Sequence, residues 1–183
     1  MRIIAGSRKG ARIFAPKGTD TRPTGDRVRE AAFNLIGPGF AEDATVLDLF
    51  AGSGAMGLEA LSRGAAHATF VENDRDACRT INRNLDKLAL DRATVLCQDA
   101  LTALRADVRA GTRYDLVLVD PPYRRFSSLQ NALIRHLPET LAPGGLLLVE
   151  TAATEEPDLP PLAKRTSRRY GSARLTLFEH ELR

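Results

Sequence analysis

The sequence has no tryptophan and only two cysteines and three histidines among its 183 residues. Cys78 and Cys97 lack the CxxC spacing of metal or redox motifs and stand in apolar segments, so we expect buried free thiols rather than disulfides or metal-bound thiolates. The histidines are scattered without the spacing of metal ligands, and we expect no metal site. A cofactor, if the protein uses one, is therefore expected to be organic.

Long hydrophobic runs are also missing. No stretch approaches the roughly 18 apolar residues that span a bilayer, and the first residues lack the apolar region of a signal peptide. We therefore expect a cytoplasmic protein that does not contact membranes. We also expect it to be a monomer. Its hydrophobic content of 43% is enough to bury one substantial core. We expect a single domain in which a basic arm and helix, residues 1–40, join the main part, residues 41–183.

The formal charge of +3 is distributed unevenly. Residues 1–30 carry eight Lys or Arg against three acids, and residues 163–174 carry five against none, so the rest of the chain is acidic. Two basic ends fit contacts with phosphates and hence a nucleic-acid partner. Charge alone fits a merely solvated basic surface equally well.

The N-terminal quarter of the chain predicts an arm followed by a helix. Residues 1–16 alternate short apolar runs with glycine and basic residues, as in a small hairpin or extended arm. Thr24 is a candidate N-cap, and Gly37-Pro38-Gly39 ends the helix. Apolar residues recur between them at the spacing of one helical face: Val28, Ala31, Ala32, Leu35 and Ile36.

From residue 45 onward, short apolar runs alternate with helical segments. The last helix carries a leucine at every fourth position (Leu129, Leu133, Leu137, Leu141), and Pro143-Gly144-Gly145 forms a turn before the next strand. Residues 174–181 alternate as in a closing hairpin. The five expected parallel strands cover residues 46–50, 68–71, 94–97, 114–119 and 146–149. The pattern predicts an α/β fold, a Rossmann-like doubly wound sheet of about seven strands with helices on both faces.

The loop after the first strand is the expected cofactor site, because ligands of such sheets bind beyond the carboxyl ends of the strands. It contains Gly52-Ser53-Gly54 and Gly57 at the GxGxxG spacing, where small residues allow close approach to the backbone. Dinucleotide-binding dehydrogenases share this spacing. An acid at Asp48 distinguishes the loop, since a carboxylate suits the cationic amino-acid end of S-adenosylmethionine and repels a pyrophosphate.

Two further acids end the next strands. Glu72 can accept hydrogen bonds from both ribose hydroxyls, and Asp99 can accept one from the adenine amino group. A surface role could explain any one acid, but three at successive strand ends favour a cofactor site. The predicted cofactor-binding residues are Thr24, Asp48, Phe50, Ala51, Gly52, Ser53, Gly54, Glu72, Asn73, Asp99 and Ala100.

Asp120-Pro121-Pro122-Tyr123 follows the fourth strand and is the predicted catalytic segment. Two prolines fix φ and remove two donors, so the carbonyls there are rigid acceptors. The Asp120 carboxylate and the Pro121 carbonyl could each accept one N–H of an exocyclic base amine and direct its lone pair at the methyl group. Tyr123 would stack on the base. Asp120 or a water molecule would take the released proton. The competing interpretation of this segment is a rigid turn without function.

These residues resemble the class I amino-methyltransferases, and the N-terminal MRIIAGSRKGARI with TRPTGDRVREAAFNLI is similar to the RsmD family of bacterial enzymes. The resemblance covers nearly the whole chain. The family methylates N2 of one guanine in 16S ribosomal RNA, so the resemblance implies S-adenosylmethionine as cofactor and an assembled or assembling small ribosomal subunit as partner, with the target in a hairpin loop near the P site. The segment from Arg22 to Arg27 is implied to help cover the cofactor. Gly25 departs from the hydroxyl residue usual in the family.

The basic residues expected to contact this RNA lie in the arm and beside the catalytic tyrosine: Arg2, Arg8, Lys9, Arg12, Arg22, Arg27, Arg124 and Arg125. Three other interpretations remain. A DNA or RNA adenine-N6 or cytosine-N4 methyltransferase shares the chemistry, but DNA enzymes generally carry extra residues for sequence readout. A non-catalytic RNA-binding protein would not bind S-adenosylmethionine. An NAD-dependent dehydrogenase is disfavoured by Asp48.

Overall fold

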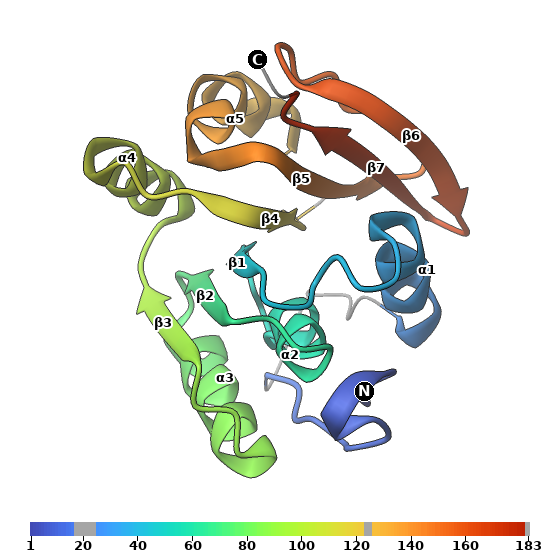
Figure 1. Ribbon diagram of the computed structural model, residues 1–183, viewed down its shortest axis with the longest axis vertical. Coiled ribbons are helices and arrows are strands. Elements are labelled where there is room, and N and C mark those ends of the chain that lie inside the picture. The colour runs from blue at the N-terminus through green and yellow to red at the C-terminus, as the bar shows by residue number, and fades with distance from the viewer. Residues whose placement is uncertain (17–24, 123–125, 182–183) are drawn as a thin grey trace.

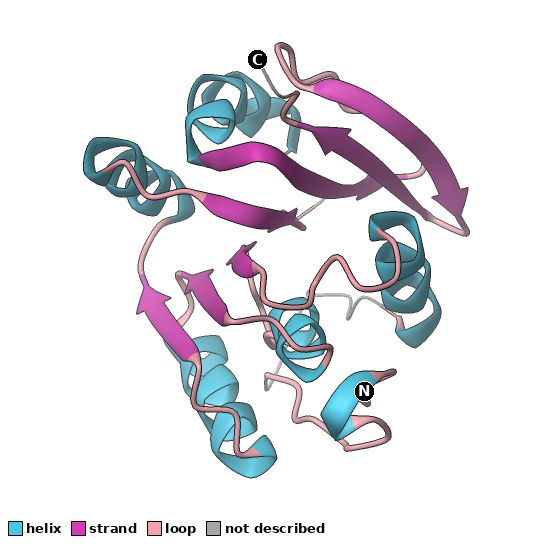
Figure 2. Cartoon of the chain, viewed as in Figure 1, coloured by secondary structure: helices cyan, strands magenta, loops and turns pink. Residues whose placement is uncertain are grey.

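The structure is a computed structural model that describes residues 1–16, 25–122 and 126–181. Figures 1 and 2 show a central sheet with helices on both sides. Its strands are β1 Thr45–Leu49, β2 His67–Glu72, β3 Ala93–Cys97, β4 Tyr114–Val119, β5 Leu141–Ala152, β6 Ala163–Tyr170 and β7 Ala173–Glu179. The helices are the short 3-10 turn η1 Gly6–Arg8, then α1 Asp26–Ile36, α2 Ala55–Ser62, α3 Arg75–Leu88, α4 Ala100–Ala110 and α5 Phe126–Thr140.

The sheet is doubly wound. Its strand order is β3-β2-β1-β4-β5-β7-β6, so the chain moves outward from β1 to one edge, returns through β4, and continues to the other edge. Strands β1 to β5 pair in parallel, while β7 inserts antiparallel between β5 and β6. The predicted Rossmann-like sheet of about seven strands is confirmed, and the closing hairpin is the β6–β7 pair.

Helices cover the two faces in separate groups. Successive strand side chains point to opposite faces, so Val46 packs with α1, α2, α3 and the arm, whereas Leu47 packs with α4 and α5. The arm belongs to the first group because Ile3 and Ile13 are buried there. Its two halves are joined as in a hairpin, with the backbone N–H of Ile3 donating to Ala11 O and that of Gly10 donating to Ile3 O.

Helix α1 starts one residue later than predicted and turns a different face inward. Gly25 is its N-cap, not Thr24, which itself lies outside the described residues. Glycine is tolerated there, and Asp26 supplies negative charge to the first turn. The helix buries Arg29, Ala32, Phe33 and Ile36, while the predicted Val28, Ala31 and Leu35 pack only at the margin. The buried face of α1 therefore differs from the predicted apolar face, because it includes the Arg29 side chain.

Three expectations at the strands were wrong. Leu141 is not the last helical leucine: α5 ends at Thr140, and Leu141 begins β5 opposite Tyr114. The predicted turn at 143–145 is an irregularity inside β5, between the Leu141 and Leu146 pairings. Cys97 is exposed because it ends the edge strand β3, whereas Cys78 is buried as expected. Within the described ranges, no helix is long and apolar enough to cross a membrane.

Candidate active site

The carboxyl ends of β3, β2, β1 and β4 form one edge of the sheet, and each carries an acid at or next to its end. Because these strands are parallel neighbours, the edge gathers Asp99, Glu72, Asp48 and Asp120 in that order. The residues come from segments separated by up to 72 positions, so only the strand order brings them together. This is the edge at which ligands of doubly wound sheets bind.

The loop after β1 has a left-handed backbone at three alternating positions. Phe50, Gly52 and Gly54 have φ of 67°, 54° and 78°, and such a conformation in the non-glycine Phe50 is strained. The loop is held by Ala51 N–H, which donates to Val71 O, and by Gly52 N–H, which donates to Glu72 Oε2 at 2.8 Å. A Cβ on Gly52 would meet nothing within 4 Å, so the space beside this backbone is open.

Asp48 lies beneath the loop rather than at its surface. Its side chain is 3% exposed, and Oδ2 accepts a hydrogen bond of 2.8 Å from the backbone N–H of Gly57 in the first turn of α2. Burial raises the pKa of Asp48 to about 7. The nearby Glu72 carboxylate also raises this pKa, whereas the hydrogen bond from Gly57 lowers it. Gly57 allows α2 to pack closely against β2, since a Cβ there would lie 2.3 Å from the Phe70 ring.

Glu72 organises the backbone on both sides of the site. Oε2 accepts from Gly52 N–H, and Oε1 accepts from the N–H groups of Asn73 and Asp74 at 2.8 and 2.9 Å. A carboxylate offers roughly four acceptor positions, so about one stays open for a ligand. The predicted pairing with both ribose hydroxyls therefore requires one backbone donor to give way.

Asp99 is the N-cap of α4. Its Oδ1 accepts from the backbone N–H and the hydroxyl of Thr102 at 3.0 and 3.2 Å, and the side chain is exposed. Ala100 follows as the first, buried residue of the helix. The cap fixes the Asp99 carboxylate at the end of β3, beside the end of β2 that carries Glu72. The adenine contact stays a prediction.

The predicted catalytic segment leaves the sheet directly beside the predicted cofactor loop. Leu49 pairs with Val119 in the parallel β1–β4 ladder, so the residues that follow them, Phe50 and Asp120, emerge on neighbouring strands about 5 Å apart. Pro121 is buried and Pro122 is exposed. The predicted Tyr123, Arg124 and Arg125 lie outside the described residues, as do Arg22 and Thr24.

The arm residues predicted to bind RNA differ in how their charges are used. Arg2 forms an ion pair of 3.4 Å with Asp26, and Arg8 donates from Nε and Nη2 to the carbonyls of Leu88 and Ala89 at the end of α3. Lys9, Arg12 and Arg27 are exposed. Arg29, which the basic count of residues 1–30 includes, is buried and adds no charge to the surface.

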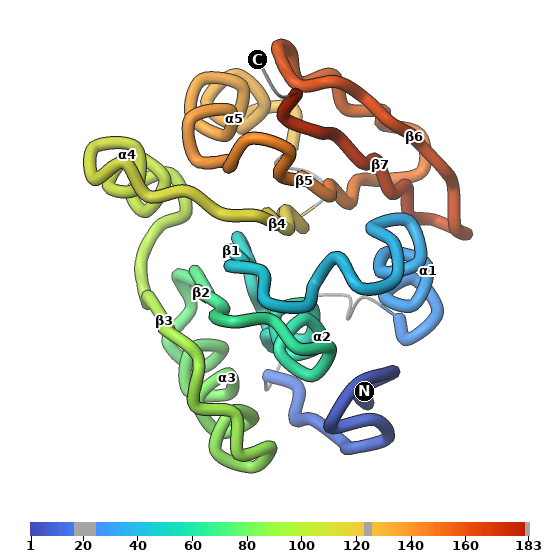
Figure 3. Tube along the Cα trace, in the orientation of Figure 1, coloured from blue at the N-terminus to red at the C-terminus, as the bar shows by residue number. Residues whose placement is uncertain are grey.

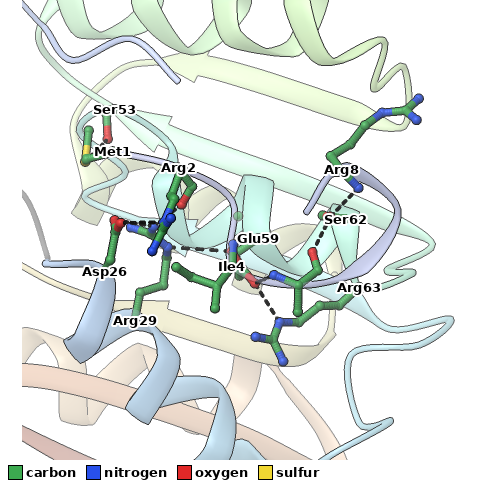
Figure 4. Close-up of polar contacts among 12 residues, drawn as sticks. Met1, Arg2, Ile4, Arg8, Asp26, Arg29, Ser53, Glu59, Ser62 and Arg63 are labelled. Atoms are coloured by element: carbon green, nitrogen blue, oxygen red, sulfur yellow. Dashed lines mark hydrogen bonds and ion pairs between the residues drawn. The ribbon is translucent and has the colours of Figure 1, made fainter. Parts of the chain in front are cut away.

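A buried carboxylate that the sequence analysis missed attaches the arm to α2. Glu59 accepts from the backbone N–H groups of Ile4 and Ala5 at 2.8 and 2.9 Å, and Figure 4 shows it between Ile4, Arg29 and Arg63. Arg63 Nε donates to it at 2.8 Å, and Arg29 Nε lies 3.7 Å from it. The sequence does contain a signal for this buried residue, because Glu59 is the one acid in the apolar helix that follows the glycine loop.

Asn84 is a second missed residue, and it connects the arm to the loop itself. The side chain is fully buried on α3. Its Oδ1 accepts from Phe14 N–H at 2.7 Å, while Nδ2 donates to the carbonyls of Phe14 and Ser53 at 3.1 and 3.2 Å. One amide thus fixes the backbone of the arm and of the candidate cofactor loop together.

The described side chains also delimit what else the edge could hold. Among them, no three His, Cys, Asp or Glu residues form a group suited to a metal ion. A hollow lined by Phe40, Asp115 and Gly144 lies at the opposite edge of the sheet, where β4 begins. It is therefore separate from the strand ends described above.

The model of the family described as Conserved hypothetical protein 95 matches residues 1–179. The chain belongs to this family. It is the RsmD family that the motifs resemble, so the expected family is confirmed.

Two curated relatives support the assignment. "Ribosomal RNA small subunit methyltransferase D" of Escherichia coli K12 is 46% identical over 125 residues, which cover 68% of this chain and 61% of that protein. "Putative rRNA methyltransferase YlbH" of Bacillus subtilis 168 is 48% identical over 125 residues, 68% of this chain and 67% of that protein. The match thus spans less than two thirds of the E. coli relative.

A solved structure of similar length shares the fold along the whole chain. The structure titled "Putative methyltransferase yhhF from Escherichia coli" is 38% identical, has a TM-score of 0.86, and covers 100% of this chain and 99% of its own. An RNA methyltransferase from Salinibacter ruber, solved with S-adenosyl-L-homocysteine, is 17% identical with a TM-score of 0.66. The second likeness shows the fold alone, and both agree with a class I Rossmann-like architecture.

Proposed function

We propose that the protein transfers the methyl group of S-adenosylmethionine to the exocyclic N2 amino group of a guanine in 16S ribosomal RNA. The observation that carries this proposal is the pairing of Leu49 with Val119, which sets Asp120 and the strained cofactor loop side by side at one sheet edge. The RsmD relatives, named as small-subunit ribosomal RNA methyltransferases, supply the substrate class.

The residues at the edge fit S-adenosylmethionine. The open space beside Gly52 admits a ligand to the backbone, and the buried Asp48 supplies negative charge under a cofactor that carries a sulfonium and an ammonium. Glu72 retains acceptor capacity for a ribose hydroxyl. Phe50, Ala51, Ser53, Gly54, Asn73, Asp99 and Ala100 would complete the site, with Thr24 from the segment before α1.

The electrostatics at Asp48 couple cofactor binding to protonation. In the protein alone, burial keeps the pKa near 7, so the carboxyl is partly protonated at neutral pH. A nearby cation favours the ionised form. Binding of the cofactor below pH 7 should therefore release a proton from Asp48, and the affinity should rise with pH up to about 7.

The bound cofactor supplies an electrophilic methyl group, and the chain supplies position. The Asp120 carboxylate and the Pro121 carbonyl each accept one N–H of the guanine amine, which directs the nitrogen lone pair toward the methyl carbon. The cofactor, when bound, would supply the methyl group and leave as S-adenosylhomocysteine, and the amine would lose one proton to Asp120 or to water. Tyr123 would stack on the base. Positioning and preorganised charge account for most of the rate.

The RNA is presented to the enzyme as part of an assembled or assembling small ribosomal subunit in the cytoplasm. The chain acts as a monomer, with residues 1–40 as part of the same domain. The basic residues that would contact phosphates are Arg2, Arg8, Lys9, Arg12, Arg22, Arg27, Arg124 and Arg125. The ion pair of Arg2 and the helix-end contacts of Arg8 would have to be shared with the RNA.

Transfer of labelled methyl groups to undermethylated small subunits tests the proposal. The subunits come from cells that lack the endogenous enzyme, and the RNA is digested to nucleosides after reaction. Label in N2-methylguanosine is the expected result. Label in N6-methyladenosine or N4-methylcytidine would support the adenine or cytosine alternative, and the absence of transfer together with the absence of cofactor binding by calorimetry would refute the proposal.

A further inference from the structure

Helix α3 carries a row of cations that no function proposed so far uses. Its four basic residues stand at four-residue intervals and are all exposed: Arg75, Arg79, Arg83 and Lys87. Side chains at this spacing are neighbours on a helix, and like charges there destabilise it. Only Arg79 has an ion-pair partner among the described residues, Asp76. Among the described side chains, no carboxylate forms an ion pair with Arg75, Arg83 or Lys87.

Phe14 of the arm holds the last two cations together. The Arg83 guanidinium carbon lies 3.7 Å from the centroid of the Phe14 ring, and Lys87 Nζ lies 4.5 Å from the same centroid. Asp86 stands three residues after Arg83, where it could form an ion pair, yet none forms between these described side chains. A stacked guanidinium keeps donors at its edge for a second partner and loses less freedom when it binds one.

The position of Phe14 is fixed relative to the cofactor loop. Asn84 bonds both backbone groups of Phe14 and, through the same amide, the carbonyl of Ser53. The buried Asn84 side chain therefore connects Phe14, whose ring contacts Arg83 and Lys87, to Ser53 of the proposed cofactor site. In Figure 3 the arm and α3 lie in the same part of the molecule, and their shared apolar cluster places both on one face of the sheet.

Cations of the arm extend the row past the end of α3. Arg8 lies over the helix C-terminus, where it contacts the carbonyls of Leu88 and Ala89, and Lys9 and Arg12 are exposed nearby in the chain. In the other direction, the row starts at Arg75, three residues after Glu72. A basic track therefore leads from the proposed cofactor edge to the arm.

We propose that Arg83 and Lys87, braced by Phe14, form a docking surface for the phosphate backbone of RNA next to the methylated nucleotide. The inference rests on the proposed function, which makes RNA the polyanion presented at this edge. Arginine and lysine held in fixed positions suit phosphates, whose contacts position the nucleic acid without reading its sequence. The competing interpretation is a solvated basic helix face with no partner.

Charge reversal on α3 against a matched reversal on α4 tests the inference. Arg83→Glu with Lys87→Glu is compared with Arg105→Glu with Arg109→Glu, which is also an exposed pair at four-residue spacing but lies on the opposite face of the sheet. Both variants change the net charge equally. Affinity for undermethylated small subunits is measured over a salt series, with S-adenosylmethionine affinity as a folding and cofactor control.

We expect the α3 variant to bind subunits about tenfold or more weakly and to lower the steepness of the log–log salt dependence by about 1.4, because two phosphate contacts at about 0.7 each are lost. The α4 variant should match the native protein in steepness. Phe14→Leu should weaken binding while all charges remain. If Arg83→Glu with Lys87→Glu fails to fold, Arg83→Gln with Lys87→Gln carries the same test at half the charge change.

Equal salt dependence for the native protein and both α3 variants would overturn the docking surface, and so would equal losses in the α3 and α4 variants. Either result leaves the proposed function intact as long as the native protein methylates the subunits. A native protein that binds cofactor and subunits but transfers no methyl group would instead refute the proposed function.

Discussion

The carboxylate of Asp48 accepts a hydrogen bond of 2.8 Å from the backbone N–H of Gly57, which ties strand β1 to the first turn of helix α2 beneath the candidate cofactor loop. The side chain is almost fully buried, and desolvation raises its pKa to about 7. A group of this kind weakens the fold when it is ionised and can be retained because the ionised form binds a cation.

Asp48→Asn should separate these two effects. The folded protein holds the Asp48 proton up to about pH 7, whereas the unfolded chain releases it near 3.8. The contribution of Asp48 to the free energy of unfolding therefore falls as pH rises from about 4 to 7 and is then constant. The variant has no such dependence. It should be more stable than the native protein at pH 8, by at most about 4 kcal/mol, and similar to it at pH 4.

The same variant should bind S-adenosylmethionine more weakly and should lose the proton release that accompanies binding below pH 7. Calorimetry in two buffers of different ionisation enthalpy measures that proton directly, and urea unfolding at pH 4 and pH 8 measures the stability. Equal stability of the two proteins at both pH values would contradict a strained, buried carboxylate at Asp48.

The buried Arg29–Glu59 contact predicts a strongly coupled pair. Glu59→Met removes the acceptor of two arm N–H groups and one of the two carboxylates beside the buried Arg29 guanidinium, which keeps Asp26 at 3.0 Å. The substitution should lower the free energy of unfolding by about 3–5 kcal/mol. Arg29→Met with Glu59→Met should recover part of this loss. The exposed pair of Arg79 and Asp76 is the control, for which Asp76→Ala should change stability by less than about 1 kcal/mol.

A double-mutant cycle by urea unfolding provides the measurement. We expect a higher free energy of unfolding for the double variant than for Glu59→Met alone. If the effects of the two substitutions were simply additive, the two side chains would not act as a pair and the attachment of the arm would depend on the backbone contacts alone.

Asn84→Ala should loosen the arm and the cofactor loop together, because the same amide bonds Phe14 and Ser53. Buried partners left without hydrogen bonds cost about 1–3 kcal/mol each. Faster hydrogen exchange at the Phe14 amide should accompany weaker S-adenosylmethionine binding. Asn82→Ala, an exposed substitution on the same helix, is the control. Faster exchange at Phe14 with native cofactor affinity would show that the arm and the loop are independent.

Local patterns in the sequence were sufficient to predict the architecture. Strands β1 to β5 and the helices between them follow from alternating apolar runs and helical spacing, and the acids at the ends of β1, β2 and β3 could be placed on one edge once the strands were taken as parallel. The adjacency of Asp120 to the loop likewise follows from the strand order of a doubly wound sheet.

What could not be predicted depends on contacts between distant segments. Arg29 was counted with the other basic residues of positions 1–30, although its guanidinium is buried between Asp26 and Glu59. Asn84 is an unremarkable polar residue of α3 until the arm folds over it. The capping role of Asp99 and the occupied oxygens of Glu72 are also invisible in a sequence motif, because backbone donors from the following turns supply those contacts.

If Asp120 positions the acceptor amine beside a separately bound cofactor, Asp120→Ala should lose methyl transfer in a single turnover and keep cofactor binding. With Asp120→Asn as the matched control for shape, transfer to undermethylated small subunits should fall by at least about 100-fold in the alanine variant, while calorimetry finds S-adenosylmethionine affinity within about threefold of the native value, a difference of less than about 1 kcal/mol. Transfer at the native rate by Asp120→Ala would show that the Asp120 carboxylate does not position the amine.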